Sequence, residues 1–280
     1  MTIEEAVPPP APAALEPPRR SGPPGWLLAG LGAGWLVALV AVAFWPGASL
    51  IDRLMVLDGG VCAQNPLHSF FPGGIQLPLC SRNTGIYLGV ASTTLWLAAT
   101  GRLRAARLPG RAVTLVLGLA ALLMAVDGFN SLFRDLGLPH PYTPQNPLRL
   151  ATGLGMGVAM AAFLLPVASA ILWRVDDERP AFGTPRELLP LLPILSIAWI
   201  AVASQTPPLL YPIAILSSLG LLLAVTLLNV VFTLGLTNRV GRFSAWRGLF
   251  PYLTLMAALA VIELMALFVL KEHVVQALTH

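Results

Sequence analysis

Cys62, His68 and Cys80 are the side chains most typical of site chemistry, and they fall in one stretch between two apolar segments. Two cysteines in an oxidising compartment predict a Cys62–Cys80 disulfide that closes this loop. Two reduced thiols remain an alternative. So does a metal site that adds His68 to the two sulfurs. Two cysteines are too few for a disulfide scaffold or a four-thiolate cluster.

A second group of polar residues lies where apolar segments begin or end. Arg82 precedes one such segment, Asp127 lies near the end of the next, and Arg149 opens the one after it. A charge at the edge of a membrane is costly alone and tends to be paired. We therefore expect Asp127 to pair with Arg82 or Arg149, and Asn146 and Tyr87 to add hydrogen bonds. These five residues form a predicted outer polar layer.

Two interpretations of the outer polar layer stay open. In one, an ion-paired clasp locks the helices together. In the other, a pocket uses the fork geometry of an arginine to bind an anionic head group or a carboxylate. The two are compatible, because a clasp can leave one arginine free.

Glu263 is a carboxylate inside an apolar segment, about seven residues or roughly 10 Å from one end of it. An ionisable group at that depth is a functional-site hypothesis by default. Asn229 and Gln205 are its candidate partners. The alternatives are a hydrogen-bonded packing residue and a step in transport.

The composition shows which elements must position these residues. Of 280 residues, 56% are apolar and 11% are charged, and the mean hydropathy is +0.76. Soluble domains are about 45–50% apolar and about 25% charged. This excludes an ordinary soluble enzyme, a disordered protein and a nucleic-acid binder. The net charge of +4 reflects 17 basic residues against 13 acidic ones, and all of the basic residues except Lys271 are arginines.

A spanning helix needs about 20 mostly apolar residues. Seven segments meet this criterion: Trp26–Phe44, Thr84–Gly101, Ala112–Phe133, Leu150–Trp173, Leu188–Ser204, Leu209–Leu236 and Gly248–Leu270. The sequence thus predicts an all-α transmembrane bundle of seven helices.

The basic residues predict its orientation, because cytoplasmic loops carry an excess of arginine and lysine. Twelve of them fall on the side of the N-terminus and five on the other side. The N-terminus is then cytoplasmic and the C-terminus lies outside, which requires the odd number of spans found. We expect multi-pass insertion in a bacterial cytoplasmic (inner) membrane.

Four regions follow from these boundaries. Residues 1–25 are rich in proline and predict a disordered cytoplasmic tail. Residues 26–173 form a four-helix membrane domain, residues 174–187 a cytoplasmic loop, and residues 188–280 a three-helix extension. The domain includes a long outer loop, 45–83, in which residues 50–58 predict either a short helix on the membrane surface or plain loop.

The string C-S-R-N-T-G-I-Y-L-G at residues 80–89 resembles the signature of an uncharacterised bacterial membrane family, domain of unknown function 2085. The family pattern there is L-C-A-R-C-T-G-I-Y-x-G. Its later motifs, D-G and N-x-L-R-x-x-T-G, resemble residues 127–128 and 146–153. The resemblance covers roughly residues 50–170, and it implies a fold and a membrane location.

The chain departs from this family pattern at two positions. Ala63 stands where the family has His, and Asn83 stands where it has Cys. A metal centre or a C-x-x-C dithiol would need those partners. The surviving pair fits a structural bridge, and we expect no metal or other cofactor.

The sparse polar residues favour a non-catalytic accessory subunit, or a component that binds lipid or a partner through the outer polar layer. A partner would be another membrane protein or a second copy of the chain. One alternative is a transporter or flippase-like protein using Arg82, Arg149 and Glu263. The other is a metal- or thiol-dependent oxidoreductase at the outer face, which requires Cys62, Cys80 and His68 to converge.

Overall fold

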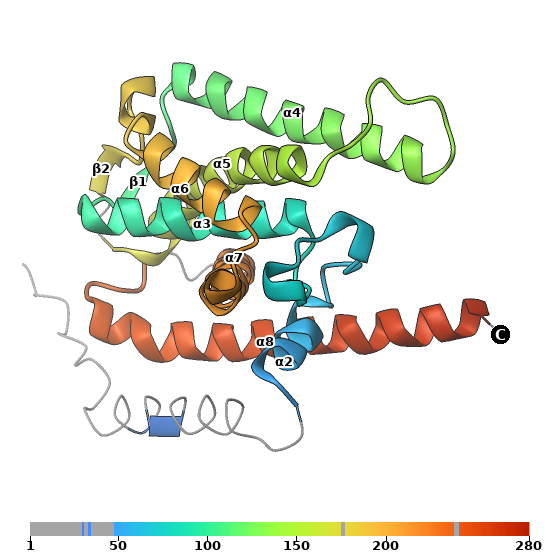
Figure 1. Cartoon of the computed structure of the whole chain (residues 1–280). Coiled ribbons are helices and arrows are strands. Elements are labelled where there is room, and N and C mark those ends of the chain that lie inside the picture. The colour runs from blue at the N-terminus through green and yellow to red at the C-terminus, as the bar shows by residue number, and fades with distance from the viewer. Residues whose placement is uncertain (1–29, 31–32, 35–47, 175–176, 238–240, 280) are drawn as a thin grey trace, which may run out of the picture.

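The computed structural model describes residues 30, 33–34, 48–174, 177–237 and 241–279 (Figure 1). The expected tail, and most of the expected span Trp26–Phe44, lie outside them. The helices are α2 (Leu50–Asp58), α3 (Ser81–Ala99), α4 (Arg111–Asp135), α5 (Asn146–Leu172), α6 (Leu191–Ala203), α7 (Leu210–Leu236) and α8 (Trp246–Thr279). Short 3-10 turns are η1 (Pro66–His68), η2 (Pro72–Gly74), η3 (Pro185–Leu188) and η4 (Pro207–Leu209). Strands β1 (Ala105–Arg107) and β2 (Asp177–Pro180) form a parallel pair.

The chain is mostly helical, which confirms the predicted class. Within the part of the chain that the structure describes, five helical segments are long and apolar enough to cross a membrane: Arg111–Asp135, Asn146–Leu172, Pro185–Ala203, Pro207–Leu236 and Trp246–Ala277. Helix α3 is formed as expected but is less apolar than these five. The number of spans and their orientation stay predictions.

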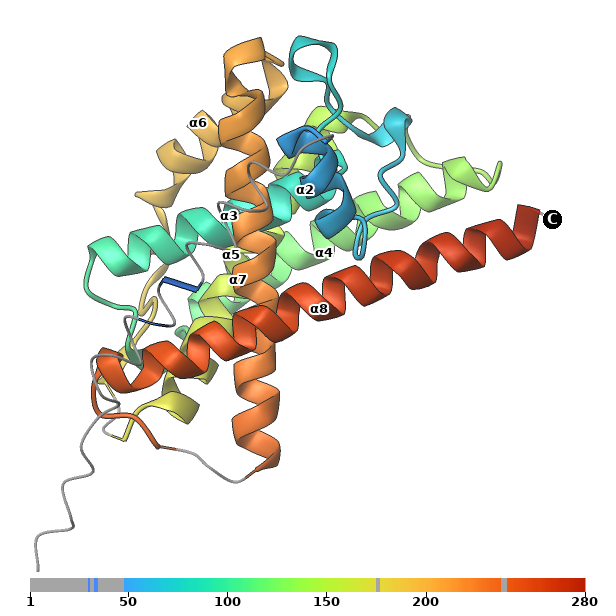
Figure 2. The ribbon, with the colours of Figure 1, turned by 90° about the horizontal axis from the view of Figure 1, so that it is seen from below.

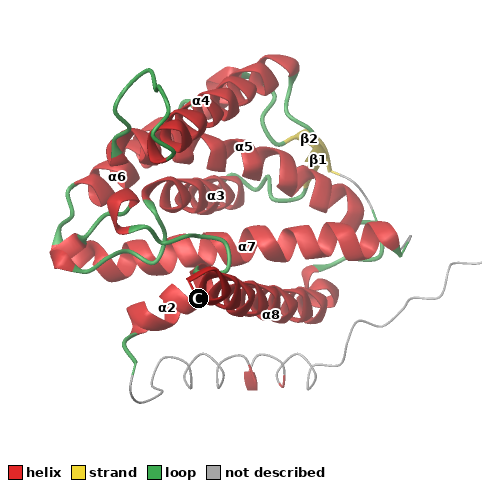
Figure 3. Ribbon diagram, turned by 90° about the vertical axis from the view of Figure 1, so that its right-hand side faces the viewer, coloured by secondary structure: helices red, strands yellow, loops and turns green. Residues whose placement is uncertain are grey.

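The helices are stacked in the order α4, α5, α3, α7 and α8, with α2 beside α8 (Figures 1 and 3). Helix α7 crosses the direction of α3 and α8 instead of running alongside them (Figure 2). The arrangement is therefore less regular than a bundle of parallel helices. The main buried core lies between α3, α5 and α7. Leucines of α4 such as Leu119 and Leu122 are exposed, as expected for a surface that faces lipid.

Helices α3 and α5 pack with their backbones in contact, because glycines line both faces. A Cβ atom at Gly85 would overlap the carbonyl of Leu150, and one at Gly157 would overlap the carbonyl of Ile86. Small residues four apart are typical of such close approach between membrane helices. This contact sets the position of Arg82, at the start of α3, relative to Arg149, at the start of α5.

Loops that the sequence places on the same side of the membrane contact one another. On the predicted inner side, β1 pairs with β2, and Trp173 bridges to Phe243. On the predicted outer side, Gln205 accepts hydrogen bonds from the Phe71 and Gly73 N–H groups. Both sets of loops thus hold together as two ends of one structure.

Helix α2 shows that residues 50–58 are helical and not plain loop. Ser49 caps its first turn, and the Asp52 carboxylate accepts from the Ser49 N–H at 2.8 Å, which completes a capping box. Asp58, its last residue, is fully buried. The helix packs on α7 and α8, so one face is covered by protein.

Candidate functional site

An ion pair joins α3 to α4 at the predicted outer end. Arg82 Nη2 lies 2.6 Å from Asp127 Oδ2, and the Asp127 side chain is only 2% exposed. The other carboxylate oxygen accepts a hydrogen bond from the Tyr142 hydroxyl at 3.0 Å. Asp127 is therefore held by a charged donor and a neutral one. Of the two arginines predicted as its partner, the structure selects Arg82.

Ser131 links this ion pair to the second arginine. Its hydroxyl donates to the Asp127 carbonyl, one turn back in α4, at 2.8 Å. The same oxygen accepts from Arg82 Nη2 at 3.2 Å and from Arg149 Nε at 3.2 Å. One serine thus places two guanidinium groups side by side at the junction of α3, α4 and α5.

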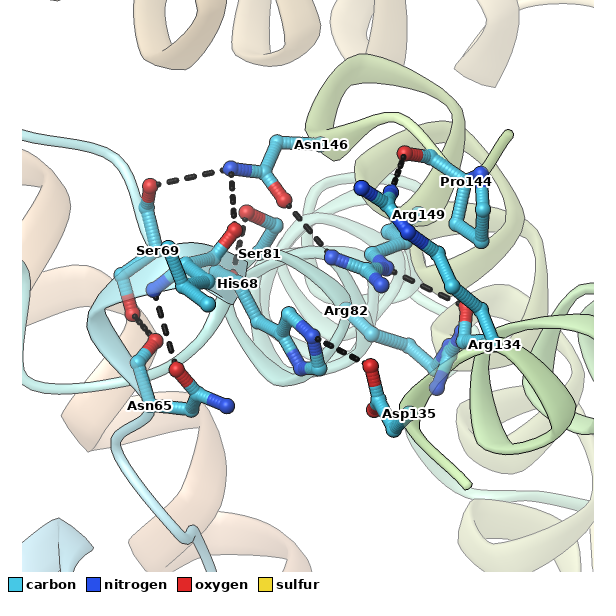
Figure 4. Close-up of polar contacts among 12 residues, drawn as sticks. Asn65, His68, Ser69, Ser81, Arg82, Arg134, Asp135, Pro144, Asn146 and Arg149 are labelled. Carbon is cyan, nitrogen blue, oxygen red and sulfur yellow. Dashed lines mark hydrogen bonds and ion pairs between the residues drawn. The ribbon is translucent and has the colours of Figure 1, made fainter. Parts of the chain in front are cut away.

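Arg149 also reaches the long loop through Asn146. Arg149 Nη1 donates to Asn146 Oδ1 at 3.0 Å, and Asn146 Nδ2 donates to the Leu67 and Ser69 carbonyls at 3.3 and 3.1 Å (Figure 4). Arg149 is almost completely buried. We call the residues joined in this way the polar cluster: Arg82, Asp127, Ser131, Tyr142, Asn146 and Arg149.

A cavity of about 210 Å³ opens beside the polar cluster, between η1, the end of α4 and the start of α5. Its lining includes Leu67, His68, Arg134, Asp135, Pro144, Asn146 and Arg149. Figure 4 shows the side chains of both arginines, His68 and Asp135 around this space. Arg134 Nη1 donates to the Pro144 carbonyl at 3.3 Å, which holds the side chain against the loop.

His68 closes one side of the cavity. Its Nε2 lies 3.4 Å from Asp135 Oδ1. Burial lowers the pKa of His68, with a further contribution from the positive charge of Arg149, while Asp135 opposes both. The imidazole is therefore mainly neutral at pH 7, and the charge of the lining comes from Arg134, Arg149 and Asp135. Two positive charges against one negative leave the cavity electropositive.

Two of the predicted site residues lie elsewhere. The Tyr87 backbone packs against Gly220 of α7, where a Cβ atom would overlap the Tyr87 carbonyl. Tyr87 is not among the residues that line the cavity. Glu263 Oε2 accepts a hydrogen bond from Asn229 Nδ2 at 2.8 Å, which joins α8 to α7. Gln205, its other candidate partner, is occupied by the loop at Phe71.

The two cysteines meet, and His68 is not with them. The Cys80 N–H donates to Cys62 Sγ at 3.2 Å, and both residues are free thiols in the structure. Their predicted disulfide stays a prediction. Among the described residues, no three His, Cys, Asp or Glu side chains gather as metal ligands. The convergence required for a Cys62–Cys80–His68 metal site does not occur, because His68 faces Asp135.

Several contributors were not predicted. Ser131 and Arg134 lie within α4 and Tyr142 in the loop after it; the fold around α4 and α5 brings Ser131 and Tyr142 into the polar cluster and Arg134 to the cavity. The burial of Asp58 was not predicted either: the sequence allowed a surface helix or a plain loop over residues 50–58, and the structure buries this carboxyl fully. Its spacing from Cys62 by one helical turn is the sequence signal that connects the two residues.

The part of the chain that carries the polar cluster and the two cysteines is similar to known proteins. Residues 62–163 match the family described as predicted membrane protein (DUF2085), which confirms the resemblance. An uncharacterized protein of Methanocaldococcus jannaschii is 28% identical over 131 residues, which make up 47% of this chain and 77% of that protein. No solved structure matches the chain. The matched segment contains the whole polar cluster and both cysteines.

Proposed function

We propose that this protein is a non-catalytic membrane component that binds an anionic group, a phosphate or a carboxylate, in the cavity beside the polar cluster. The observation that carries this proposal is the pair of arginines, Arg134 and Arg149, lining a cavity of about 210 Å³. Guanidinium groups bind carboxylate and phosphate oxygens through paired N–H donors. The Asn146 side chain adds polar atoms to the lining.

The contacts already made by the arginines support a division of roles. Arg82 is neutralised by Asp127 and acts as the clasp between helices. Arg149 uses Nε and Nη1 within the polar cluster, and Arg134 uses one nitrogen on a backbone carbonyl. Neither of these two arginines has an ion pair among the described residues. They provide the positive charge for an anion.

The anion has two sources that share one chemistry: the head group of an anionic lipid, or a free solute. The exposed apolar surface of α4 continues from Arg134 through Phe129 and Val126, so an acyl chain would have a surface on which to lie. This continuity favours the lipid. The proposed protein is then a lipid-binding component or accessory subunit of a membrane assembly.

The test uses the full chain in a neutral detergent and two probes. Native mass spectrometry with phosphatidylglycerol, and with phosphatidylcholine as the neutral comparison, reports lipid binding. Calorimetry with inorganic phosphate reports the free anion. We expect phosphatidylglycerol to bind and phosphatidylcholine not to bind. Binding of phosphate with equal affinity would assign a solute site, and retention of neither anion would refute the proposal.

Variants at the two ends of α4 provide a matched pair. Arg134→Gln removes a charge from the cavity lining, and we expect binding to weaken about tenfold, since a hydrogen bond to a charged group contributes about 1.5–3 kcal/mol. Arg111→Gln removes the same charge at the opposite end of the helix. It is expected to leave binding unchanged. Equal effects of the two substitutions would indicate a general charge effect.

We also propose the predicted topology, with the N-terminus in the cytoplasm of a bacterial cell and the C-terminus outside. The grouping of loops at two ends supports the division into two sides, and the excess of arginine and lysine on the side of the N-terminus supports the direction. Single cysteines introduced at Glu178 and Glu272 of a cysteine-free chain test it, because both side chains are exposed. A membrane-impermeant maleimide added to intact cells should label position 272 and leave position 178 unmodified. Labelling of position 178 and not of position 272 would show that the chain has the opposite orientation.

A further inference from the structure

The sulfur of Cys62 is surrounded by hydrogen-bond donors. It accepts from the Cys80 N–H at 3.2 Å and from the Gln64 N–H at 3.4 Å. Cys62 is 4% exposed, so little water competes for these contacts. A thiolate is a stronger acceptor than a thiol. Both backbone donors therefore favour the ionised form of Cys62.

Gln64 is held in an unusual backbone conformation that aims its N–H at this sulfur. Its φ is +55°, in the left-handed region that non-glycine residues rarely adopt. Its Nε2 donates to the Met55 and Pro78 carbonyls at 2.7 and 2.9 Å, and its carbonyl accepts from Gln76 Nε2 at 2.8 Å. Such strain persists only where the surroundings enforce it, and it is concentrated at functional sites.

The start of helix α3, at Cys80, is a second feature that favours a thiolate at Cys62. Cys80 is the N-cap residue of α3, whose 19 residues start at Ser81. The first N–H groups of a helix carry partial positive charge, which lowers the pKa of a nearby cysteine. The N–H of Cys80 itself contacts Cys62 Sγ. The Cys62 sulfur is thus seated at the positive end of α3.

Four titratable or charged groups surround the pair. Asp58 is fully buried; its Oδ2 accepts from the Ser218 hydroxyl at 2.7 Å, and its Oδ1 has no partner among the described residues. Lys271 Nζ donates to the Cys62 carbonyl at 3.4 Å. Tyr87 and Arg82 are close enough to interact electrostatically with the thiols.

These surroundings shift the pKa values of the two thiols in opposite directions. Hydrogen bonds from Cys80 lower the pKa of Cys62, while the hydrogen bond to Cys62 and burial raise the pKa of Cys80. Burial raises the pKa of Asp58 to about 7, against the Ser218 hydrogen bond. At neutral pH, one thiolate and one thiol therefore lie side by side, with the charge on Cys62.

We propose that Cys62 and Cys80 form a reversible dithiol–disulfide pair, in which Cys62 reacts with a small peroxide and Cys80 resolves the product. The Cys62 thiolate attacks one peroxide oxygen and breaks the O–O bond, which gives a sulfenic acid and hydroxide. The hydroxide takes the proton released by Cys62. The Cys80 thiol then displaces water from the sulfenic acid. Two thiols and one hydrogen peroxide thus yield one disulfide and two waters.

The geometry favours this order of events over the reverse. Cys62 is the more buried of the two, which favours a small oxidant, whereas Cys80 is more exposed to the thiol that later reduces the bond. Ser81 and Arg82 follow directly, so the bond would form next to the polar cluster. Oxidation would join the long loop covalently to the helix that carries Arg82.

The test uses the full chain, reduced and then exposed to equimolar hydrogen peroxide. Peptide mapping without reductant should show a Cys62–Cys80 disulfide that a small thiol reverses. In Cys80→Ser, the sulfenic acid persists and a cyclic diketone probe should modify Cys62. In Cys62→Ser, labelling of Cys80 should be at least tenfold slower. Comparable labelling of the two, or disulfides only between separate chains, would overturn the proposal.

A measurement on the unsubstituted protein covers the case in which a variant fails to fold. Brief alkylation of the reduced chain at pH 7 should modify Cys62 with a haloacetamide of small size before Cys80, and denaturation should remove this preference. A preference for Cys80 in the folded chain would contradict the assignment of the thiolate. Gln64→Gly, which keeps the N–H without the backbone strain, should retain the order of reaction.

Discussion

Arg82 and Asp127 connect α3 to α4 through a 2.6 Å ion pair that is buried on the carboxylate side. The pair supplements the packing of α4 on α5, where a Cβ atom added to Gly155 would touch Ala120. It also sets Ser131, and through it Arg149, at the edge of the cavity. The clasp and the proposed anion site are therefore parts of one hydrogen-bonded structure.

Asp127→Asn should destabilise the protein while Asp135→Asn should not. The asparagine keeps the shape of the side chain but leaves Arg82 without its counter-charge, and breaking a buried pair costs about 3–5 kcal/mol. Because the Arg82 side chain is 23% exposed, water recovers part of this, and we expect a loss of about 1–3 kcal/mol. Asp135 is 46% exposed. The midpoint of thermal unfolding in detergent measures the effect of each substitution. Equal midpoints for the two variants would contradict the clasp.

Gly157→Ala should weaken the contact between α3 and α5, with Gly118→Ala as the matched control. The added methyl at position 157 meets the Ile86 carbonyl, and overpacking of this kind costs about 1–3 kcal/mol. At Gly118 of α4, nothing lies within 4 Å of the new atom. That change should be neutral or slightly stabilising, because alanine favours helix by up to about 1 kcal/mol. A neutral result at position 157 would mean that the helices can separate without cost.

The pattern of apolar residues predicts how deep a residue lies along its helix, but not which way it faces around the helix axis. The apolar segments and their polar ends placed Arg82, Asp127 and Arg149 near one another, because a helix of known rise leaves little choice of depth. Rotation about each helix axis is not determined in this way. Tyr87, one turn after Asn83 in the sequence, packs its backbone against Gly220 of α7 and does not line the cavity. Tyr142 lies in a loop without periodicity, and its contact with Asp127 depends on the loop path.

The surroundings of Cys62 show a second kind of contact that the sequence does not predict. The sequence of residues 50–58 allowed either a surface helix or a plain loop, and neither predicts a buried Asp58, since a charged residue is usually exposed. In the structure α2 packs on α7, and Ser218 of α7, 160 positions after Asp58, supplies the hydrogen bond. Long-range partners of this kind leave no local signature. The left-handed backbone of Gln64 is equally unmarked, because glycine or asparagine is the usual residue there.

Asp58 should give the protein a stability that falls between pH 4 and pH 7. The pKa of this carboxyl is raised from 3.8 to about 7, so the unfolded chain loses its proton at a lower pH than the folded chain. The stabilisation is complete below pH 4 and is lost as pH rises through 7. Each pKa unit corresponds to about 1.4 kcal/mol.

Asp58→Asn isolates this contribution when both chains also carry Cys62→Ser. The variant should gain about 1–3 kcal/mol relative to its parent between pH 5 and pH 8, because the amide does not ionise. Unfolding by urea at a series of pH values measures the difference. A constant difference across this range would show that Asp58 is ionised in the folded protein throughout.

Glu263 and Asn229 provide a test of whether a carboxylate among apolar residues serves packing or proton movement. Asn229 Nδ2 donates to Glu263 Oε2 at 2.8 Å, and a glutamine at position 263 retains an acceptor for this bond. Glu263→Gln should therefore change the unfolding midpoint very little. Glu263→Leu removes the acceptor and leaves the Asn229 amide unpaired between two helices, at a cost of about 1–3 kcal/mol. The double variant Glu263→Leu, Asn229→Leu should recover most of that loss, because no polar group is then left without a partner. If glutamine proved as harmful as leucine, the charge of Glu263 and not its hydrogen bond would be what α7 and α8 require.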